Sequence, residues 1–399
     1  MGIFKAYDIR GIYPSELDEK LAHSIGNAMA RFINKSPVVV GRDVRVSSPS
    51  VAQALIEGIL DFGINVIDIG ICTTPMNYFA IGHLNAAGGV MTTASHNPAQ
   101  YNGFKLCKEK AIALSYERGI SDIEKIVSSG EYKKASQRGK LSSATIIEPY
   151  SKHIRTVAGT VLPLKIVIDA GNGATGLFIN EVFGSLNCKI YPLFFEPDGR
   201  FPNHEANPLK LENLRHLQKQ VKEVNADIGV AFDGDGDRCA FIDENADVIT
   251  SDIVTALIAK QILKIHQGGK ILYDLRSSLV VPEEIKASGG EPIRSRVGHA
   301  YMKEIMRDKD VAFGGELSGH YYFRENYYAD SGFLALATVL SILSKEKKHI
   351  SELVNPLKRY YATGEINFEV KNKDAKIEEI SKIFADAEID YLDGITVSY

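Results

Sequence analysis

The sequence predicts an α/β protein with three similar α/β domains of mixed or parallel sheet, followed by a partial fourth α+β domain. Two observations support this prediction. Apolar strands alternate with amphipathic helices along the chain, a pattern typical of sheets with helices on their faces. Residues 38–45, 165–173 and 270–278 also resemble one another, since each stretch combines an apolar strand, an aspartate near its end and a polar loop.

The alternation begins close to the N-terminus. We expect a helix from about Ser15, a residue type that caps helix N-termini, with Asp18 in its first turn. The apolar face of this helix would comprise Leu17, Leu21, Ile25, Met29 and Phe32. The elements expected after it are a strand at 38–40, a helix at about 49–60, a strand at 64–70, a short helix and a strand at 88–91.

A second strand follows each of the three similar stretches and leads into a polar loop. These loops are MTTASHNP (91–98), FDGDGDR (232–238) and GGELSGH (314–320). Because open α/β sheets bind ligands at the carboxyl ends of their strands, we expect the three loops to carry the functional site. The expected domains are 1–147, 148–249, 250–362 and 363–399.

The segment after Gly364 has a different pattern. Ile366, Phe368 and Val370 alternate as in a half-exposed strand. One face of a short helix would comprise Ile377, Ile380, Ile383 and Phe384. So short a segment cannot bury an independent core, so we interpret it as the first part of a fourth domain.

The loop at 232–238 predicts a metal site. Asp233, Asp235 and Asp237 alternate with glycine after a buried strand. Alternate side chains of an extended backbone point the same way, and the glycines let the chain curl tightly around a ligand. Three neighbouring carboxylates repel one another unless a hard divalent cation such as Mg²⁺ holds them. An acidic surface turn is the alternative. A helix–loop–helix calcium loop is excluded, because Arg238 stands where that loop needs glycine and both flanks resemble strands.

The loop at 91–98 offers Ser95 as a candidate reactive group. It is not a nucleophile elbow, and the adjacent His96 does not by itself make a catalytic dyad. A plain turn at the end of a strand is the alternative. A phosphorylated Ser95 would, however, be a good ligand for the cation held by the three aspartates. Lys105, in YNGFK, supplies a charge for a phosphate or a proton carrier.

The loop at 314–320 combines a carboxylate, a hydroxyl and an imidazole, from Glu316, Ser318 and His320. This mixture suits a ligand with many hydroxyls, because each hydroxyl both donates and accepts hydrogen bonds. A polar surface loop is the alternative. Arg296 and His299 lie beside a glycine in RSRVGH and could bind a phosphate, although a solvated face explains that pattern equally well.

Composition excludes several classes of protein. The formal net charge of −4 argues against a general nucleic-acid binder. The four cysteines are scattered without a C-x-x-C pair, which predicts neither a zinc site nor a disulfide framework and fits a cytoplasmic location. We see no signal peptide and no apolar run of the roughly 18 residues that a membrane span needs.

Taken together, these motifs resemble the α-D-phosphohexomutase family, of the phosphomannomutase/phosphoglucomutase type. The resemblance covers essentially the whole chain, in the order FKAYDIRG, GRDVR, TTASHNP, YNGFK, DAGNG, PNHEANP, DGDGDR, VGHAYMK and GGELSGH. It implies four domains around a deep central cleft, three of them similar. The family's fourth domain carries a phosphate-binding loop that reads like R-x-S-G/N-T-x-P, which this sequence does not contain. From this we expect weaker binding of the distal phosphate.

The resemblance also implies roles for individual residues. Ser95 would be the phosphoserine and, with Asp233, Asp235 and Asp237, would hold one Mg²⁺ per chain. The transferred phosphoryl group would be surrounded by Arg10, His96, Lys105, Arg238 and His320. The sugar and its distal phosphate would be bound by Tyr7, Arg296, His299, Glu316 and Ser318.

The implied reaction interconverts hexose 1-phosphate and hexose 6-phosphate, with mannose or glucose as the sugar. Phospho-Ser95 would form a hexose 1,6-bisphosphate intermediate, which also serves as activator, and Lys105 or His320 would accept the hydroxyl proton. The alternatives are a phosphoglucosamine mutase, a magnesium-dependent sugar phosphatase, and an impaired truncated paralogue that only binds sugar phosphates. Leu317 argues against the first, because such relatives tend to have glutamine there. We expect a monomer or dimer.

Overall fold

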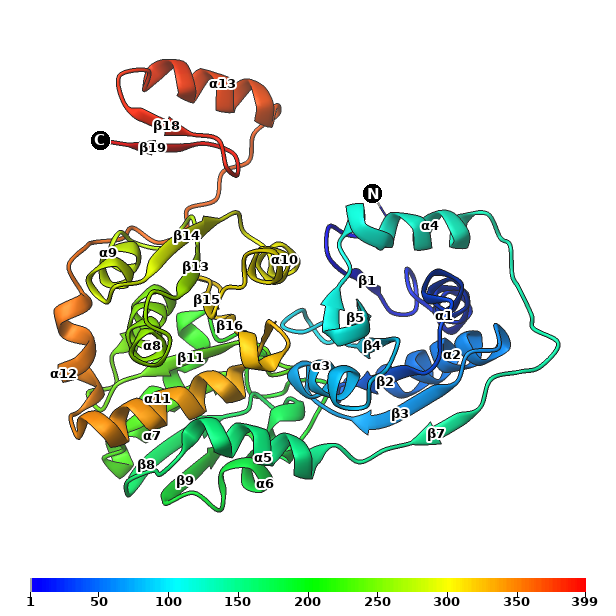
Figure 1. Cartoon of the computed structure of the whole chain (residues 1–399), viewed down its shortest axis with the longest axis horizontal. Helices are drawn as coiled ribbons and strands as arrows, with labels where there is room; N and C mark the ends of the chain where they lie inside the picture. The colour runs from blue at the N-terminus through cyan, green and yellow to red at the C-terminus, as the bar shows by residue number, and fades with distance from the viewer. Residues whose placement is uncertain (1) are drawn as a thin grey trace.

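Three mixed sheets follow one another along the chain in the computed structural model, which describes residues 2–399 (Figure 1). The first sheet has the strand order β1-β5-β4-β2-β3-β7, and β6 pairs with β5. Its strands are β1 (Ile9–Ile12), β2 (Val38–Arg42), β3 (Val66–Ile71), β4 (Gly88–Thr92), β5 (Tyr101–Lys108), β6 (Ile112–Ala113) and β7 (Leu141–Ser143). Its helices are α1 (Glu19–Ile33), α2 (Ser48–Asp61), α3 (Thr74–His83) and α4 (Ser121–Ser128).

The second and third sheets each have five strands, in the orders β12-β11-β10-β8-β9 and β14-β13-β15-β16-β17. The second unit comprises α5 (Ile147–Ala158), β8 (Leu164–Asp169), α6 (Ile179–Phe183), β9 (Cys188–Leu193), α7 (Arg215–Val224), β10 (Ile228–Phe232), β11 (Cys239–Ile242) and β12 (Val248–Ile249). The third comprises α8 (Ser251–Ile265), β13 (Lys270–Asp274), α9 (Val280–Ala287), β14 (Glu291–Ser295), α10 (His299–Lys309), β15 (Phe313–Gly315), β16 (Tyr321–Phe323), β17 (Ala329–Asp330), α11 (Gly332–Glu346) and α12 (Ile350–Val354). The predicted fold class, three similar α/β units, is confirmed.

The repeated aspartate makes the same local turn in all three units. Oδ1 of Asp43, Asp169 and Asp274 accepts a hydrogen bond from the backbone N–H two residues further on, at 2.8–3.0 Å. Aspartate favours this turn because its short side chain can replace a backbone acceptor. The repeat seen in the sequence therefore reflects a repeated way of ending a strand.

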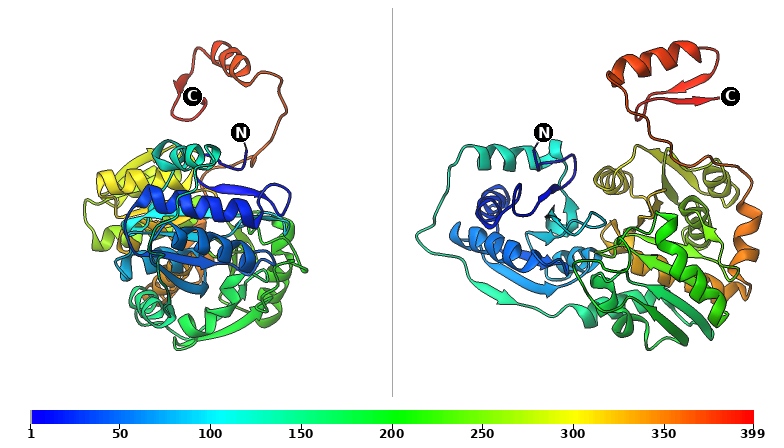
Figure 2. Two further views of the ribbon diagram at one scale, coloured as in Figure 1. Left: turned by 90° about the vertical axis from the view of Figure 1, so that its right-hand side faces the viewer. Right: turned by 180° about the vertical axis from the view of Figure 1, so that it is seen from behind.

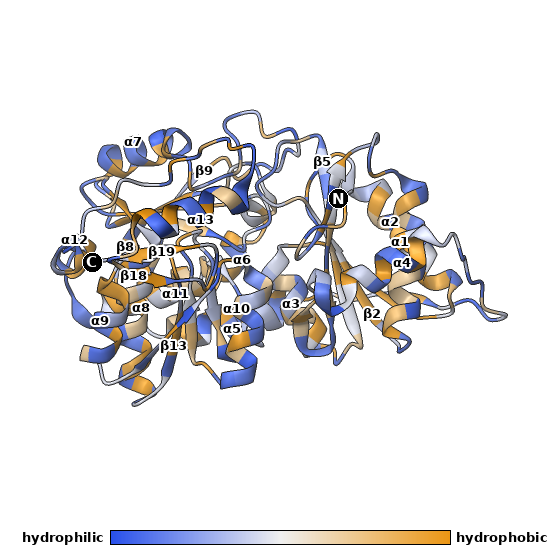
Figure 3. Cartoon of the chain, turned by 90° about the horizontal axis from the view of Figure 1, so that it is seen from above, coloured by the Kyte–Doolittle hydropathy of each residue, from blue (hydrophilic) through white to orange (hydrophobic). Residues whose placement is uncertain are grey.

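The apolar core is divided unequally between the units. One buried cluster, which includes Ile25 and Leu55, belongs to the first unit alone. A larger cluster runs through the second and third units and includes Phe79 of α3, Tyr150 of α5 and Phe333 of α11. Figure 3 shows apolar and polar residues on the same helices, as in α1, α2 and α7, because one face of each helix is buried. The larger cluster also contains Val39, Met91 and Cys107 of the first sheet, so it joins all three units.

Helix α1 begins later than predicted. Its N-cap is Asp18, whose Oδ1 accepts a hydrogen bond from the Leu21 N–H at 2.8 Å. Ser15 lies instead in a turn, since the N–H groups of Glu16 and Leu17 both donate to the Ile12 carbonyl. Ser15 and Asp18 are both residue types that cap helices. Asp18 is the cap because Ser15 lies in the turn that precedes the helix. The other elements expected in the first hundred residues are present within a few positions.

The C-terminal segment projects from the third unit (Figures 1 and 2). It comprises α13 (Lys373–Ile383) and an antiparallel pair, β18 (Glu388–Asp390) and β19 (Thr396–Ser398). The short helix is confirmed. The strand predicted at 366–370 is wrong: these residues form no strand, and Phe368 is 82% exposed. Alternation alone does not make a strand when no neighbouring strand pairs with it.

Candidate active site

The predicted metal loop, residues 232–238, joins β10 to β11. Asp233, Asp235 and Asp237 are almost completely buried, and one carboxylate oxygen from each lies within 4.8 Å of the others. The predicted convergence and the tight curl at the glycines are confirmed, but the predicted extended backbone is wrong. The backbone is not extended here: it turns tightly at Gly236, whose φ is +74° and whose N–H donates to the Asp233 carbonyl. Glycine adopts this conformation without steric cost.

The charges of this loop are only partly balanced within the chain. Lys105 Nζ lies 2.7 Å from Asp235 Oδ2 and also pairs with Asp237. Burial, followed by the charges of Asp235 and Asp237, raises the pKa of Asp233 well above its usual value. Burial alone would lower the pKa of Lys105, but Asp235 and Asp237 outweigh it and raise that pKa. The site therefore favours additional positive charge.

Two carboxylate oxygens of the metal loop have no hydrogen-bond partner among residues 2–399. They are Oδ1 of Asp235 and Oδ1 of Asp237, and both are buried. Unpaired buried carboxylate oxygens are costly unless a cation coordinates them. Oxygen ligands of this kind fit a hard divalent ion.

Ser95 lies against this cluster. Its Oγ donates a hydrogen bond to Asp233 Oδ2 at 2.8 Å and lies 3.2 Å from His96 Nδ1. Ser95 is 2% exposed and has a φ of +50°, which is uncommon for a residue with a side chain. Such conformations persist only where the surroundings enforce them, and they concentrate at functional sites.

Arg45 enforces the conformation of the serine loop, residues 91–98. Its guanidinium is buried and donates to the backbone carbonyls of Ser95, Asn97, Pro98 and Tyr101 at 2.6–3.0 Å. The sequence analysis gave Arg45 no role. The signal was present, since Arg45 is the last residue of the GRDVR motif.

A cavity of about 370 Å³ opens above Ser95. It is lined by Lys5, Ala6, Tyr7, Asp8, Arg10, Ser95, His96, Lys105, Arg238, His299 and His320. Eight of the predicted site residues therefore meet in one place. Arg10 is oriented by Asn97 Oδ1 at 2.6 Å and by Asp8 Oδ2 at 2.5 Å. The sequence analysis missed Lys5 and Asp8.

Positive charge dominates this cavity. Burial, together with the charges of Arg238 and Arg10, lowers the pKa of His96 to about 2, so its ring is neutral. Burial and the charges of Asp8 and Glu316 raise the pKa of Tyr7. The edge of the Tyr7 ring packs against His299, with 4.9 Å between the ring centres. Such a cavity suits an anionic ligand with hydroxyl groups.

The third loop, residues 314–320 or the glutamate loop, is held by contacts with neighbouring elements and within itself. Oε1 of Glu316 accepts from the Gly298 N–H at 3.0 Å, and Oε2 accepts from the Tyr322 hydroxyl. Ser318 Oγ lies 2.9 Å from His320 Nδ1. Neither Glu316 nor Ser318 is among the residues that line the cavity. Their predicted contacts with sugar hydroxyls stay predictions.

Arg296 lies outside the cavity. Its side chain is exposed, and its guanidinium lies over the Tyr301 ring, 3.2 Å from the ring centre. The nearby Val297 N–H donates to Asp393 Oδ2 of the C-terminal segment at 3.1 Å. The structure thus leaves Arg296 apart from the other predicted site residues, and its role also stays a prediction.

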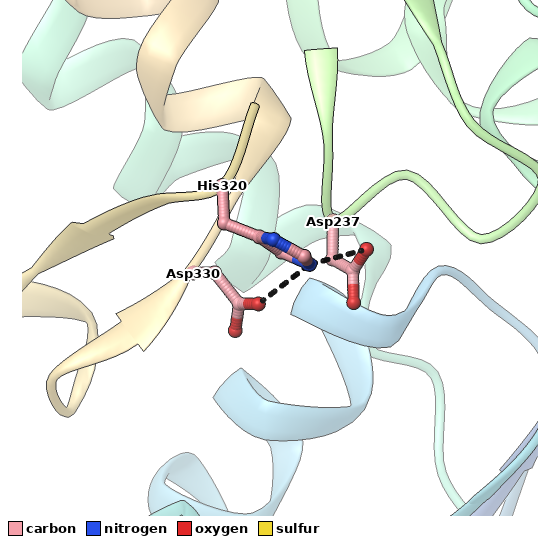
Figure 4. A group of neighbouring side chains, drawn as sticks. All are labelled: Asp237, His320 and Asp330. Carbon is pink, nitrogen blue, oxygen red and sulfur yellow. Dashed lines mark ion pairs between the residues drawn. The ribbon is translucent and has the colours of Figure 1, made fainter. Parts of the chain in front are cut away.

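The loops of the three units contact one another directly. Arg238 and His320 form an isolated antiparallel backbone bridge, and the Cys239 N–H donates to the Gly319 carbonyl at 3.1 Å. From the first unit, Thr74 donates to Asp235 through its backbone N–H at 2.8 Å and through its hydroxyl at 2.6 Å. Figure 4 shows Asp237 of the metal loop beside His320 and Asp330 of the third unit.

The fold and the site define a multidomain α/β protein with a buried serine, three carboxylates and a ring of cations at the meeting point of its domains. Models of phosphoglucomutase/phosphomannomutase alpha/beta/alpha domains I, II and III match residues 1–134, 148–246 and 250–360. The chain belongs to the phosphoglucomutase/phosphomannomutase family. The resemblance inferred from the sequence motifs is confirmed.

Individual relatives agree with this assignment. The chain is 40% identical over 401 residues to phosphohexose mutases of Xanthomonas campestris pv. campestris, covering 99% of this chain and 90% of the relative. It is 41% identical to a phosphomannomutase of Methanocaldococcus jannaschii, covering 99% and 88%. A crystal structure of a phosphoglucomutase/phosphomannomutase family protein from Burkholderia thailandensis superposes with a TM-score of 0.92 at 33% identity, covering 100% and 88%.

Among the described residues, no helix is both long and apolar enough to cross a membrane.

Proposed function

We propose that this chain is a phosphohexose mutase that interconverts hexose 1-phosphate and hexose 6-phosphate, with mannose phosphates as first candidates. The observation that carries the proposal is the position of Ser95. Its Oγ lies 2.8 Å from Asp233 of the three-carboxylate cluster, at the base of a cavity lined by Arg10, Lys105 and Arg238. The names of the relatives support the same activity.

Asp233, Asp235, Asp237 and a phosphorylated Ser95 would hold one Mg²⁺ per chain. The unpaired Oδ1 atoms of Asp235 and Asp237 support this assignment. A bound Mg²⁺ would offset the negative charge of the transferred phosphoryl group.

The side chains of the site promote the transfer by positioning the substrate and by stabilising the negative charge of the phosphoryl group. The phosphoryl group leaves Ser95 Oγ and bonds to the C1 or C6 hydroxyl oxygen of the hexose monophosphate, giving a hexose 1,6-bisphosphate. The bond from phosphorus to Oγ breaks as the bond to the sugar oxygen forms. Arg10, Lys105 and Arg238 stabilise the negative charge of the group in transit. The bisphosphate then turns around and returns its other phosphoryl group to Ser95.

The hydroxyl proton needs an acceptor, and we assign this role to His320. Its Nε2 accepts a hydrogen bond from Arg238 Nε at 3.2 Å, so this nitrogen carries the lone pair. Lys105 is held as a cation by Asp235 and Asp237 and is better suited to binding the phosphoryl group. Tyr7 and His299 would contact the sugar, and Arg296 its distal phosphate.

The test is a coupled assay with Mg²⁺ and a hexose 1,6-bisphosphate primer on mannose 1-phosphate, glucose 1-phosphate and glucosamine 1-phosphate. We expect formation of the 6-phosphate from the mannose or glucose substrate, and loss of that activity in Ser95→Ala. Full activity of Ser95→Ala would exclude the phosphoserine mechanism. Release of inorganic phosphate without 6-phosphate would indicate a phosphatase, and no turnover at all a binding protein.

A further inference from the structure

Asp330, the last residue of β17, lies close to His320 but does not line the cavity (Figure 4). Its side chain is completely buried. Its Oδ2 is 3.7 Å from His320 Nε2, and Asp237 Oδ1 is 3.5 Å from the same nitrogen. The His320 imidazole thus lies between a carboxylate of the metal loop and a carboxylate of the third unit.

Lys303 of α10 balances the charge of Asp330. Its Nζ lies 2.6 Å from Asp330 Oδ1, and the two side chains are 1% and 0% exposed. The ammonium also lies over the ring of Tyr78, 4.0 Å from the ring centre. Tyr78 belongs to α3 of the first unit, the helix that contacts Asp235 through Thr74. The pair therefore connects His320 to the first unit.

Stability alone does not account for this ion pair. Taking two charges out of water costs several kcal/mol each, and well-packed apolar side chains often stabilise a protein as much or more. Although the pair is close, Lys303 Nζ and both oxygens of Asp330 lack a well-aligned hydrogen bond among residues 2–399. The imidazole of His320 is the adjacent group on which the charge of Asp330 can act.

The other contacts of His320 show why a fixed neighbour is needed. At Nδ1, Ser318 Oγ lies 2.9 Å away and the buried Glu316 Oε2 3.5 Å away, whereas at Nε2 Arg238 donates a hydrogen bond at 3.2 Å. In the proposed reaction Arg238 also contacts the phosphoryl group, so its guanidinium is shared between His320 and the substrate. Asp330 is buried and bound to Lys303, so it stays in place throughout the reaction.

We propose that Asp330, supported by Lys303, is a positioning residue for His320: its fixed negative charge, 3.7 Å from Nε2, attracts the imidazolium that exists after Nε2 has accepted the hydroxyl proton and so keeps the ring in place beside the transferred group. This inference rests on the proposed function, because it assumes that His320 accepts the hydroxyl proton. Asp330 acts only through His320 and touches no reacting atom.

The test replaces both charges together, so that neither is left buried and alone. In a Lys303→Met/Asp330→Asn variant we expect kcat to fall by about 10- to 100-fold, as is typical when a residue that orients a catalytic group is lost. We expect KM for mannose 1-phosphate and the Mg²⁺ concentration for half-maximal activity to stay unchanged. The control is Lys260→Met, which removes an ion pair with Glu284 between α8 and α9, with kcat expected to be unchanged. A wild-type kcat in the double variant would overturn the proposal.

A second measurement does not depend on turnover. We expect the ¹⁵N resonances of the His320 ring to shift in the double variant, while those of His204, which is paired with Asp169 away from this cavity, stay in place. An unchanged His320 signal would overturn the positioning role even if the wild-type protein proved not to be a mutase. Lys303→Gln/Asp330→Asn keeps a polar contact between the two positions and provides the same test if the methionine form does not fold.

Discussion

The metal loop and the glutamate loop occupy equivalent places in their sheets but use their carboxylates differently. Each joins a parallel strand to an antiparallel neighbour, β10 to β11 and β15 to β16. Asp235 and Asp237 each keep one oxygen without a partner among the described residues, whereas both oxygens of Glu316 accept hydrogen bonds from Gly298 and Tyr322. At the same place in the sheet, the metal loop thus leaves carboxylate oxygens available to a ligand, whereas the carboxylate of the glutamate loop is paired with donors from neighbouring elements.

The largest effect should come from the metal loop. Asp235→Asn removes one carboxylate from the proposed Mg²⁺ site, and a metal contact of this kind contributes several kcal/mol, so we expect a loss of about 10³-fold in kcat/KM. We also expect Mg²⁺ to raise the melting temperature of the wild-type protein and to leave that of the variant unchanged. Retention of that rise in the variant would show that the cation binds elsewhere.

The serine loop should depend on Arg45 for stability. Arg45→Met leaves Asp43 buried without its partner and four backbone carbonyls without a donor, so we expect a loss of about 3–5 kcal/mol in the free energy of unfolding. Urea denaturation measures this loss. Arg200→Met, at an exposed pair with Asp198, is the matched control and should change stability by less than about 0.5 kcal/mol. Equal effects of the two substitutions would contradict the role given to Arg45.

In the glutamate loop we expect a substitution to lower the stability of the fold without changing the binding of Mg²⁺. Glu316→Gln weakens the contacts with Gly298 and Tyr322, which should cost about 1–3 kcal/mol in unfolding free energy. The Mg²⁺ dependence of the melting temperature should stay that of the wild type, because the metal loop is intact. If Glu316→Gln abolished that dependence, the contrast between the two loops would be wrong.

The smallest effect on stability is expected at Asp169, one of the three aspartates that make the same turn at the end of a strand. His204 Nε2 is 3.0 Å from Asp169 Oδ2. Burial alone would lower the pKa of His204, but the hydrogen bond and the charge of Asp169 raise it above its ordinary value. Its contribution to stability is therefore complete below about pH 6.5, the pKa of unfolded histidine, and is lost as the pH rises through the folded value. Melting temperatures of wild type and His204→Gln should differ more at about pH 6 than at about pH 8.

Much of the site could be predicted because its residues stand in short motifs at the ends of strands. The spacing of Asp233, Asp235 and Asp237 predicted their convergence even though the turn at Gly236 produces it. The pairing of Ser95 with Asp233 could be proposed only from chemistry, since nothing local in the sequence brings the first and second units together.

The contacts of Lys303, Asp330 and Thr74 could not be predicted in this way. They depend on how α10, β17 and α3 pack against one another. Asp330 and Thr74 belong to no local pattern that indicates a site, and Lys303 ends the VGHAYMK motif but was given no role in it. The strand wrongly predicted at 366–370 is the opposite case. There the local pattern was clear, but strand formation depends on a pairing partner elsewhere in the molecule.

The burial of Ser95 restricts which phosphoryl donors can reach its hydroxyl. The hydroxyl is 2% exposed, the backbone around it is fixed by Arg45, and the cavity above it measures about 370 Å³. A protein kinase needs a peptide segment that can extend into its own cleft, which this loop cannot do while folded. If Ser95 is the phosphoserine that we propose, its phosphoryl donor is therefore a small molecule, and the fraction of active protein depends on the supply of that molecule.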